Sequence, residues 1–399
     1  MIDDGYDFDG VINLINEYAF LHDTRNTDFF VNALHKRFPN EWVPYITAVD
    51  NSLLFDQSAV LSDPAAPDSL KTFLQSCCKY SLLQDCEPPS KVTVAKGLKW
   101  KKAHEVEKTI QLLHELVAQH SITRIVDVGC GLGHLAKEAA AAIPNVRIVG
   151  VEMDEDLCAK ASSSSFENLT CFHTKLSEDM CADEIRQIFM GFETDRSLIV
   201  SLHGCGPLQP LLMKTFAELP TRTNPVLLSI ACCYHKINVQ EIDLAAYALS
   251  ERLTGIATVS KCTLSHTTLR LACQPRLKPL TSDECSVHET EFFNRATLEV
   301  LLSERSGKRA RLRGKKLEEF LAQERIEASE LSDKKELFTD QRPLIEPHTA
   351  LQGHFQAVLE SLILADRAMF LKEKNIAVNL IPLFHSSISP RNMAIVATR

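Results

Sequence analysis

The sequence predicts an α/β fold built around a largely parallel sheet. Three features predict it: short apolar runs rich in β-branched residues recur from residue 125 onwards, helical stretches separate them, and a cluster of glycines follows the first run. A strand, a tight glycine turn, a helix and a second strand succeed one another within about 30 residues. That is the order of a βαβ unit, and it therefore predicts neighbouring parallel strands.

The first part of the chain, residues 1–95, predicts a helical extension. Apolar residues recur at helical spacing within Val11–Ala19 and again within Phe29–Leu34. Proline-rich breaks follow at Asp63–Pro67 and at Pro88–Ser90. We take the second break as the end of the extension.

Residues 96–235 predict the first part of the core domain, in which helices and strands alternate. The expected elements are helix His104–Gln119, strand Ile125–Val128, helix Ala136–Ala142, and strands Val146–Val151, Leu169–His173, Ser197–Leu202 and Val226–Ala231. Residues 236–348 break the alternation with charged, helical segments, and we interpret them as a partly basic insertion. Residues 349–399 complete the core with helix Ala350–Lys372 and with strands Ala377–Leu383 and Met393–Thr398.

Composition excludes several classes of protein. The 399 residues are 45% hydrophobic and 24% charged, as in an ordinary globular chain. No apolar run approaches the ~18 residues of a membrane span, so we expect no membrane association. The acidic N-terminus lacks the features of a secretory signal, and the 13 scattered cysteines suit free thiols. These features predict a cytoplasmic or nuclear protein.

Charge is unevenly distributed along the chain. The net charge of −9 argues against a uniformly basic surface for nucleic acid. One segment, Arg305–Lys316, nevertheless holds seven Lys and Arg residues and no acid. This segment predicts a phosphate-attracting patch or a nuclear-import signal, while a solvated loop or helix face is the alternative.

The most informative segment is the glycine cluster that follows the first predicted strand, residues 127–133 (DVGCGLG). Glycines at alternate positions let the backbone turn sharply and let a ligand lie against bare peptide groups. Glu152 ends the next strand, where a carboxylate can accept hydrogen bonds from both hydroxyls of a ribose. A nucleoside cofactor is therefore predicted, with these contacts: Asp127, Gly129, Cys130, Gly131, Gly133 and Glu152.

The spacing of the glycines separates two kinds of cofactor. A dinucleotide fold requires G-x-G-x-x-G, which this segment fits only loosely. The run from Asp127 to Gly133 instead resembles motif I of the class I methyltransferases, which have a Rossmann-like sheet with an antiparallel last strand. That resemblance implies S-adenosylmethionine as the cofactor. No residue is assigned to the adenine, because the third strand runs into Phe172–Leu176 without an Asp.

Further segments are similar to a narrower family, the one that includes methyltransferase-like protein twenty-five and its relatives that carry a ribosomal RNA adenine dimethylase domain. The segments are Asn40–Trp42, Lys101–Val106, Leu202–Gly206, Cys232–His235 and Ser389–Asn392. Two departures stand out, because this chain has Leu98-Lys99-Trp100 where the family has Met-Ser-Pro, and Pro207 where it has Asp. The resemblance implies a methyltransferase of undefined substrate class, and Pro207 puts one substrate contact in doubt.

Chemically active side chains follow the fourth and fifth predicted strands, whose carboxyl ends meet at one edge of the sheet. The candidates for catalysis are His203, Cys205, Tyr234 and His235. Either histidine can serve as a base, and Tyr234 can stack on a planar substrate. Two alternatives stay open: small thiols can simply fill space at the strand ends, or two Cys and two His can bind zinc. We assign no residue as a metal ligand.

The sequence leaves two functions open. The first is a methyltransferase that acts on RNA or protein, which the glycine cluster and Glu152 favour. The alternative is a non-catalytic RNA-associated binding or assembly factor that keeps the methyltransferase fold, which Pro207 favours. Neither the methyl acceptor nor the oligomeric state follows from the residues.

Overall fold

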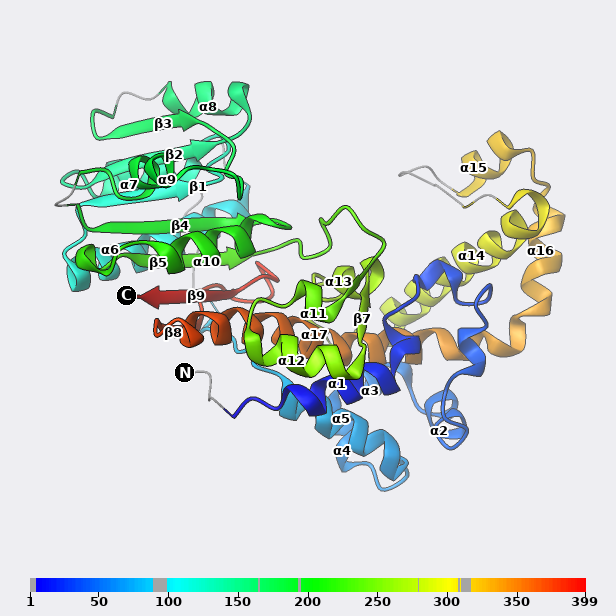
Figure 1. Cartoon of the computed structure of the whole chain (residues 1–399). Helices are drawn as coiled ribbons and strands as arrows, with labels where there is room; N and C mark the ends of the chain where they lie inside the picture. Colours follow the sequence, from blue (N-terminus) through cyan, green and yellow to red (C-terminus); the bar gives the residue numbers. More distant parts are fainter. Residues whose placement is uncertain are drawn as a thin grey trace. The chain divides into compact units, whose positions relative to one another are not determined.

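The chain folds into two compact units, each built from separated segments. The computed structural model describes residues 5–88, 99–163, 166–192, 195–278, 280–307, 309 and 317–399 (Figure 1). Unit 1 consists of Met1–Ile12, Leu82–Pro275 and Glu360–Arg399, and unit 2 of Asn13–Ser81 and Arg276–Leu359. Two helices, α1 (Phe8–Glu17) and α17 (Ile345–Glu373), contribute residues to both units.

A seven-stranded sheet forms the centre of unit 1, with the strand order β3-β2-β1-β4-β5-β9-β8 (Figure 1). Its strands are β1 (Arg124–Val128), β2 (Arg147–Glu152), β3 (Leu169–His173), β4 (Ser197–Gly204), β5 (Val226–Ala231), β8 (Ala377–Pro382) and β9 (Met393–Thr398). The first five strands pair in parallel, while β9 pairs antiparallel with both β5 and β8. The predicted fold class, with its antiparallel last strand, is confirmed.

The central strands are buried along their whole length, which explains why their sequences are nearly continuous apolar runs. Every residue of β1 and of β5 is buried. Strands of a parallel sheet are covered on both faces, so they lose the alternation of apolar and polar residues that a half-exposed strand shows. The order in which strands are added to the sheet reverses after β3, because β4 pairs with the other side of β1.

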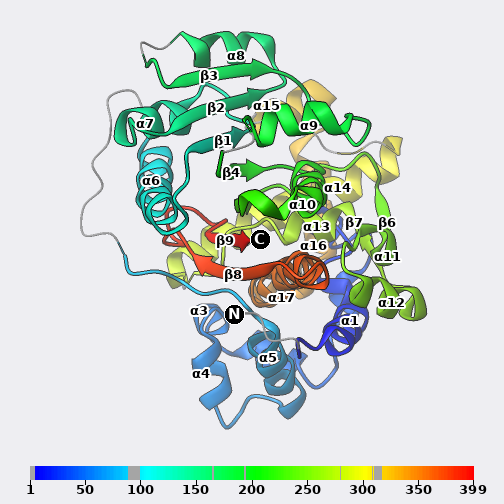
Figure 2. The ribbon, with the colours of Figure 1, turned by 60° about the vertical axis from the view of Figure 1, so that its left-hand side comes forward.

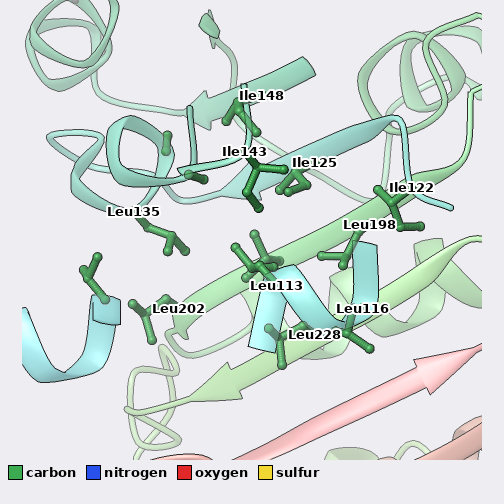
Figure 3. Close-up of a cluster of buried hydrophobic side chains, with 14 of the residues drawn as sticks. Leu113, Leu116, Ile122, Ile125, Leu135, Ile143, Ile148, Leu198, Leu202 and Leu228 are labelled. Atoms are coloured by element: carbon green, nitrogen blue, oxygen red, sulfur yellow. The ribbon is translucent and has the colours of Figure 1, made fainter. Parts of the chain in front are cut away.

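Helices cover both faces of this sheet. The helices of unit 1 are α6 (Trp100–His120), α7 (His134–Ala142), α8 (Glu155–Ser162), α9 (Ala182–Phe189), α10 (Leu208–Glu218), α11 (Leu244–Tyr247), α12 (Glu251–Ser260) and α13 (His266–Leu271). Figure 2 shows α6 and α7 on one side of the sheet and α10 on the other. Between α6, α7 and the strands lies an apolar core that includes Leu113, Leu135, Ile125, Leu198 and Leu228 (Figure 3).

A two-stranded sheet follows β5 in unit 1. Strands β6 (Glu241–Asp243) and β7 (Thr263–Ser265) pair antiparallel, with Glu241 opposite Ser265. The sequence did not predict this sheet. Each strand has only three residues, and their charged and hydroxyl side chains give no apolar run to mark a strand.

Unit 2 is helical. It contains α2 (Val43–Ala48), α3 (Asn51–Leu54), α4 (Gln57–Ser62), α5 (Asp68–Tyr80), α14 (Ser282–Ser306), α15 (Leu317–Glu324) and α16 (Ala328–Leu337), and the 3₁₀ turns Ala19–Leu21, Asn26–Asp28, Leu34–Lys36 and Thr339–Leu344. Aromatic side chains fill part of its interior, where Tyr18 stacks on Trp42 with ring centroids 5.7 Å apart. A second apolar cluster joins α14, α15 and α16 through side chains such as Leu298, Phe320 and Leu331.

The structure bears on the expected absence of a membrane span and on the basic segment. Among the described residues, no helix has the length and apolar character required to cross a bilayer. Most of the basic segment Arg305–Lys316, namely Lys308 and residues 310–316, lies outside the described residues. Its described members include Arg305, which lies in the last turn of α14, and Arg309, which pairs with Asp28 at 3.0 Å.

Candidate functional site

The glycine turn between β1 and α7 has the backbone conformation that its sequence predicts. Gly129, Gly131 and Gly133 all have positive φ, at 74°, 57° and 73°. A Cβ on Gly133 would lie 2.9 Å from the Cβ of Ala161, so this glycine allows α7 to approach α8. A Cβ on Gly131 would meet no described atom within 4 Å. The space beside Gly131 is therefore open to a ligand.

Glu152, at the end of β2, faces this turn. One carboxylate oxygen, Oε2, accepts a hydrogen bond from the Gly131 amide at 2.8 Å. The other, Oε1, accepts from the amides of Met153 and Asp154 at 2.9 and 3.0 Å. These three bonds fix the carboxylate at the carboxyl end of the sheet, next to the open space. Oε2 has a further lone pair with which it can accept a ribose hydroxyl, whereas both lone pairs of Oε1 are used by the two amides.

Asp127, at the end of β1, is buried and incompletely bonded. Burial raises the pKa of its carboxyl group to about 7. The structure gives its Oδ2 atom no hydrogen-bond partner among the described residues. Buried carboxylate oxygens without partners are uncommon in folded proteins, and they suggest a ligand or an ordered water. An ammonium group of a ligand would supply both a hydrogen bond and a compensating charge.

Cys130 occupies the turn in a different way from the glycines. An added Cβ on Gly150 of β2 would lie 2.9 Å from the Cys130 sulfur and 2.8 Å from the Cys171 sulfur. The Cys130 side chain therefore packs over the sheet against Gly150 and Cys171. Its hydrogen bond with Cys171, together with burial, raises the pKa of the Cys130 thiol. Any contact of Cys130 with a cofactor falls to its backbone.

A large exposed apolar side chain borders the site. Met153 directly follows Glu152 and is 66% exposed, while Leu132 in the glycine turn is 42% exposed. An apolar side chain next to the Glu152 carboxylate can pack on the face of an aromatic ring such as adenine. The sequence alone does not single out Met153, because this residue follows the strand without any polar signal.

A hydrogen-bonded chain of three side chains lies where β4 ends. His203 has a φ of 79°, at the point where the pairing of β4 with β5 shifts register between Leu202 and Gly204. Its Nε2 atom lies 2.9 Å from Oε2 of Glu105 on α6. The Ser389 hydroxyl donates to the other carboxylate oxygen of Glu105 at 2.7 Å. The strained backbone at His203 thus directs its ring towards a buried carboxylate.

Glu105 is held as a carboxylate by these partners. Burial alone would raise the pKa of Glu105, but the hydrogen bond and charge of His203, the hydroxyl of Ser389 and the Lys101 ammonium outweigh burial and lower it. Lys101 lies 3.7 Å away. An imidazole whose Nε2–H donates to a carboxylate has Nδ1 free to accept a proton, which is the arrangement of a general base and its orienting acid. The His203 side chain is 27% exposed.

The thiols converge more closely than the sequence predicts, but without the histidines. The sulfur of Cys205 lies 2.8 Å from that of Cys232, which lies 3.3 Å from that of Cys233. Neither His203 nor His235 has a ring nitrogen in the group formed by these three sulfur atoms. Positive φ at His203 breaks the alternation of an extended chain, and His235 Nδ1 lies 3.5 Å from the sulfur of Cys273.

Tyr234 lies beneath the surface and does not face an open site. It is 5% exposed, and its burial raises the pKa of its hydroxyl well above the usual value. Its amide donates to Cys273 at 3.1 Å. This position suits packing rather than stacking on a substrate.

The end of β4 also contacts the glycine turn. The Ser201 hydroxyl donates to the carbonyl of Val128 at 3.2 Å, and the side chain of Leu208 lies 3.5 Å from the position of a Cβ on Gly129. The segments that carry His203 and Cys205 are therefore bonded and packed to the strand and turn that carry Asp127 and Gly129. Nothing in the sequence marks Glu105 or Ser389 individually, although both lie in segments that support the family resemblance.

Comparison with known proteins gives this site a chemical class. Residues 101–240, about a third of the chain, match the family model described as a methyltransferase domain. This range includes the glycine turn, Glu152, the Glu105–His203 pair and the three clustered thiols. The strand order and the antiparallel β9 agree with the class I methyltransferase sheet. S-adenosylmethionine is the methyl donor of that class.

Solved structures show only weak similarity to this chain. DesVI of Streptomyces venezuelae is 16% identical with a TM-score of 0.25, covering 33% of this chain and 52% of its own. CalS10, a SAM-bound amino pentose methyltransferase from Micromonospora echinaspora, is 16% identical with a TM-score of 0.24 (36% and 59% covered). Coclaurine N-methyltransferase bound to N-methylheliamine and SAH is 12% identical with a TM-score of 0.27 (94% and 99% covered). This chain spans about half of the DesVI length, and similarities at this level indicate neither substrate nor mechanism.

Proposed function

We propose that this protein is an S-adenosylmethionine-dependent methyltransferase that acts on RNA or protein. The observation that carries the proposal is the combination of Asp127 and Glu152 around the open space at Gly131. Both carboxylates end neighbouring parallel strands, and the unpartnered Oδ2 of Asp127 offers a site for an ammonium group. A scaffold that did not bind a cofactor would have no use for a buried, unpartnered carboxylate.

Each part of the cofactor has a matching group in the chain. Asp127 would bind the ammonium, Glu152 a ribose hydroxyl through Oε2, and Met153 the adenine face, while Gly131 leaves room for the ligand beside bare backbone. S-adenosylmethionine, when bound, supplies an electrophilic methyl group. The protein would then have to position an acceptor and take up its proton.

His203 is the group best suited to take up that proton. Its Nε2 is held by Glu105, and Glu105 is held by Ser389, so the ring is oriented by a chain of buried hydrogen bonds. Nδ1 would accept the proton of the acceptor, and the carboxylate of Glu105 would stabilise the resulting imidazolium. Glu105 acts as a positioning residue in this scheme, since it reaches the reaction only through His203.

Calorimetry with S-adenosylmethionine tests the cofactor site. We expect saturable binding that Glu152→Gln weakens about ten- to hundredfold, because hydrogen bonds to a charged acceptor contribute about 1.5–3 kcal/mol. Glu155→Gln changes an exposed glutamate in the first turn of α8 by the same chemistry and should bind normally. Equal affinities in wild type and Glu152→Gln, with both folded, would contradict the cofactor site.

The acceptor requires a separate experiment. Incubation with radiolabelled S-adenosylmethionine and cell extract, followed by digestion with ribonuclease or with protease, should release label with one of the two treatments. Release by ribonuclease identifies RNA as the acceptor, and release by protease identifies protein. Cofactor binding without any labelled acceptor would instead favour a non-catalytic binding or assembly factor with the same fold.

A further inference from the structure

Three cysteines from two loops meet at the carboxyl edge of the sheet. Cys205 follows β4, while Cys232 and Cys233 follow β5, and their sulfur atoms all lie within 4.8 Å of one another. Among the described residues, this is the one group of three or more His, Cys, Asp or Glu side chains whose ligand atoms lie close enough together to bind one metal ion. All three are half-buried and none forms a disulfide. They are therefore sheltered from bulk solvent yet open to a small ion.

The backbone holds the two loops together independently of the thiols. The Gly206 amide donates to the carbonyl of Cys233 at 3.0 Å, and so does the Lys236 amide at 3.1 Å. Gly206 has a positive φ of 55°, and a Cβ at this position would collide with the carbonyl oxygen of Lys236. The loops approach this closely because residue 206 has no side chain. The convergence of the thiols is thus built into the fold.

We infer that Cys205, Cys232 and Cys233 form a zinc site with one coordination position open to a ligand from outside the protein. Thiolates are preferred ligands of zinc, with Zn–S bonds of about 2.3 Å, which places tetrahedral sulfur ligands about 3.8 Å apart. That spacing lies within the 4.8 Å span of the three thiols. The closest pair, Cys205 and Cys232, has to separate by about 1 Å, which small side-chain rotations allow.

The charges around the cluster are consistent with a bound cation. Three thiolates and one divalent zinc ion leave a net charge of −1. The ammonium of Lys236 interacts electrostatically with all three cysteines, so it can balance this charge. A structural role in packing requires no cation beside neutral thiols. A disulfide would use two of the sulfur atoms and leave the third unexplained.

Among the described residues, no imidazole nitrogen joins the group of ligand atoms that lie within 4.8 Å of one another, so the fourth position has no protein ligand. His203 Nε2 is bonded to Glu105, and His235 Nδ1 contacts Cys273. Three protein ligands with an open position are typical of zinc sites that bind water or a substrate, whereas structural sites use four. If the proposed methyltransferase function holds, this position lies at the edge of the sheet that carries the methyl donor. The metal site itself does not depend on that function.

Metal analysis of the full chain, purified without chelator, tests the inference. We expect about one zinc per chain in the wild type, and its loss in Cys205→Ser and in Cys232→Ser. Cys181→Ser is the matched control, because Cys181 is exposed at the start of α9, where serine is a good helix cap. Circular dichroism must show that every variant is folded. Zinc retained in both cluster variants, or absent from the wild type, overturns the site.

Two further measurements do not need the variants. Cobalt added to the metal-free protein should give the thiolate-to-cobalt absorption and the intense visible bands of a tetrahedral site, and imidazole should shift those bands by occupying the open position. Zinc should also protect the three cysteines from alkylation until a chelator is added. Unprotected thiols, or a Cys205–Cys232 disulfide in the freshly purified protein, would contradict the site. None of these readouts requires binding or turnover of S-adenosylmethionine, so each separates failure of the metal site from failure of the proposed function.

Discussion

Burial raises the pKa of Asp127 to about 7, and its Oδ2 has no partner among the residues that the structure describes. At neutral pH the free protein therefore holds a carboxyl group that loses its proton only at a cost in stability. A raised pKa in the folded state gives stability that is fully present below about pH 3.8 and is lost as the pH rises through about 7. A cationic ligand would offset this loss of stability, because its charge favours the ionised form of Asp127.

The first prediction concerns Asp127→Asn. The variant should be more stable than the wild type at pH 8, by at most about 4 kcal/mol, because each pKa unit corresponds to about 1.4 kcal/mol. The difference should shrink at pH 5, where the wild-type carboxyl is protonated. S-adenosylmethionine should bind the variant poorly at both pH values, and it should bind the wild type about tenfold more weakly per pH unit below pH 7. Thermal unfolding and calorimetry at several pH values measure both effects. A stability difference independent of pH would contradict this account.

The second prediction concerns the pair His203 and Glu105. His203→Asn, which tolerates positive φ, should lower kcat about 10²- to 10⁴-fold without changing cofactor affinity, as expected for loss of a general base. Glu105→Gln should lower kcat less, because Nε2 keeps a hydrogen-bonding neighbour but loses the compensating charge. The double variant should be no slower than His203→Asn alone. Additive losses would show that Glu105 acts independently of His203, in packing rather than in positioning.

At the residue scale, the sequence indicates which residues belong to the candidate site more readily than it indicates where their side chains point. The carboxylates Asp127 and Glu152 and the glycines follow from a linear motif whose geometry is local. The direction of His203 does not, because it depends on a positive φ at a register shift between β4 and β5. Its partners Glu105 and Ser389 come from positions far away in the chain. A pattern read along one strand cannot show such a partner.

At the element scale, the glycines of the turn between β1 and α7 have different roles. Gly133 allows α7 to pack on α8, and Gly131 leaves open space. Both have positive φ, so replacing either by alanine costs about 1 kcal/mol from the backbone alone. The two positions therefore form a matched pair: an alanine has the same backbone strain at both, but its methyl group meets Ala161 only at position 133.

The third prediction compares Gly131→Ala with Gly133→Ala. Gly133→Ala should lose more stability, because its methyl group would lie 2.9 Å from the Cβ of Ala161 and force α7 and α8 apart. Gly131→Ala should lose less stability but more cofactor affinity, because its methyl group would point into the ligand's space. Denaturant unfolding and calorimetry of both variants decide between these effects. Equal losses in both measurements would mean that the open space at Gly131 is not the cofactor site.

The sequence predicted the strands of the seven-stranded sheet closely. β5, β9 and the largely exposed β3 have the predicted bounds, and β1, β2, β4 and β8 differ by one or two residues at their ends. Burial on both faces demands continuous apolar runs, which are easily recognised. Helix α17 begins at Ile345, five residues before the predicted start at Ala350. Its first turn contains Glu346 and Pro347, which obscure the apolar pattern.

At the scale of the whole molecule, long-range contacts complete unit 1. The Leu82 amide donates to Ser361 at 2.8 Å, and the Asn392 side chain donates to the carbonyl of Gln84 at 2.9 Å. These bonds join segments roughly 300 residues apart, and composition and periodicity carry no signal for them. The same holds for the division into two units, each of which is assembled from separated segments of the chain.

The basic segment Arg305–Lys316 stands out against the net charge of −9. Arg309 pairs with the buried carboxylate of Asp28, so its removal would leave a buried charge without a partner. We therefore expect its neighbours, rather than Arg309, to be available to phosphates. A variant that tests this replaces four of these neighbours by alanine: Lys308, Arg311, Arg313 and Lys315.

The fourth prediction is that this fourfold variant binds RNA more weakly and with a flatter salt dependence. Each lost phosphate contact lowers the slope of log affinity against log salt by about 0.7 for single strands, so four contacts lower it by up to about 3. Fluorescence anisotropy with a single-stranded RNA, at several salt concentrations, measures both quantities. The matched control replaces four exposed lysines from elsewhere in the chain: Lys36, Lys160, Lys175 and Lys278. It changes the net charge equally, so an equal loss in the control would reduce the effect to overall charge. Unchanged binding in the fourfold variant would show that the segment does not contact RNA.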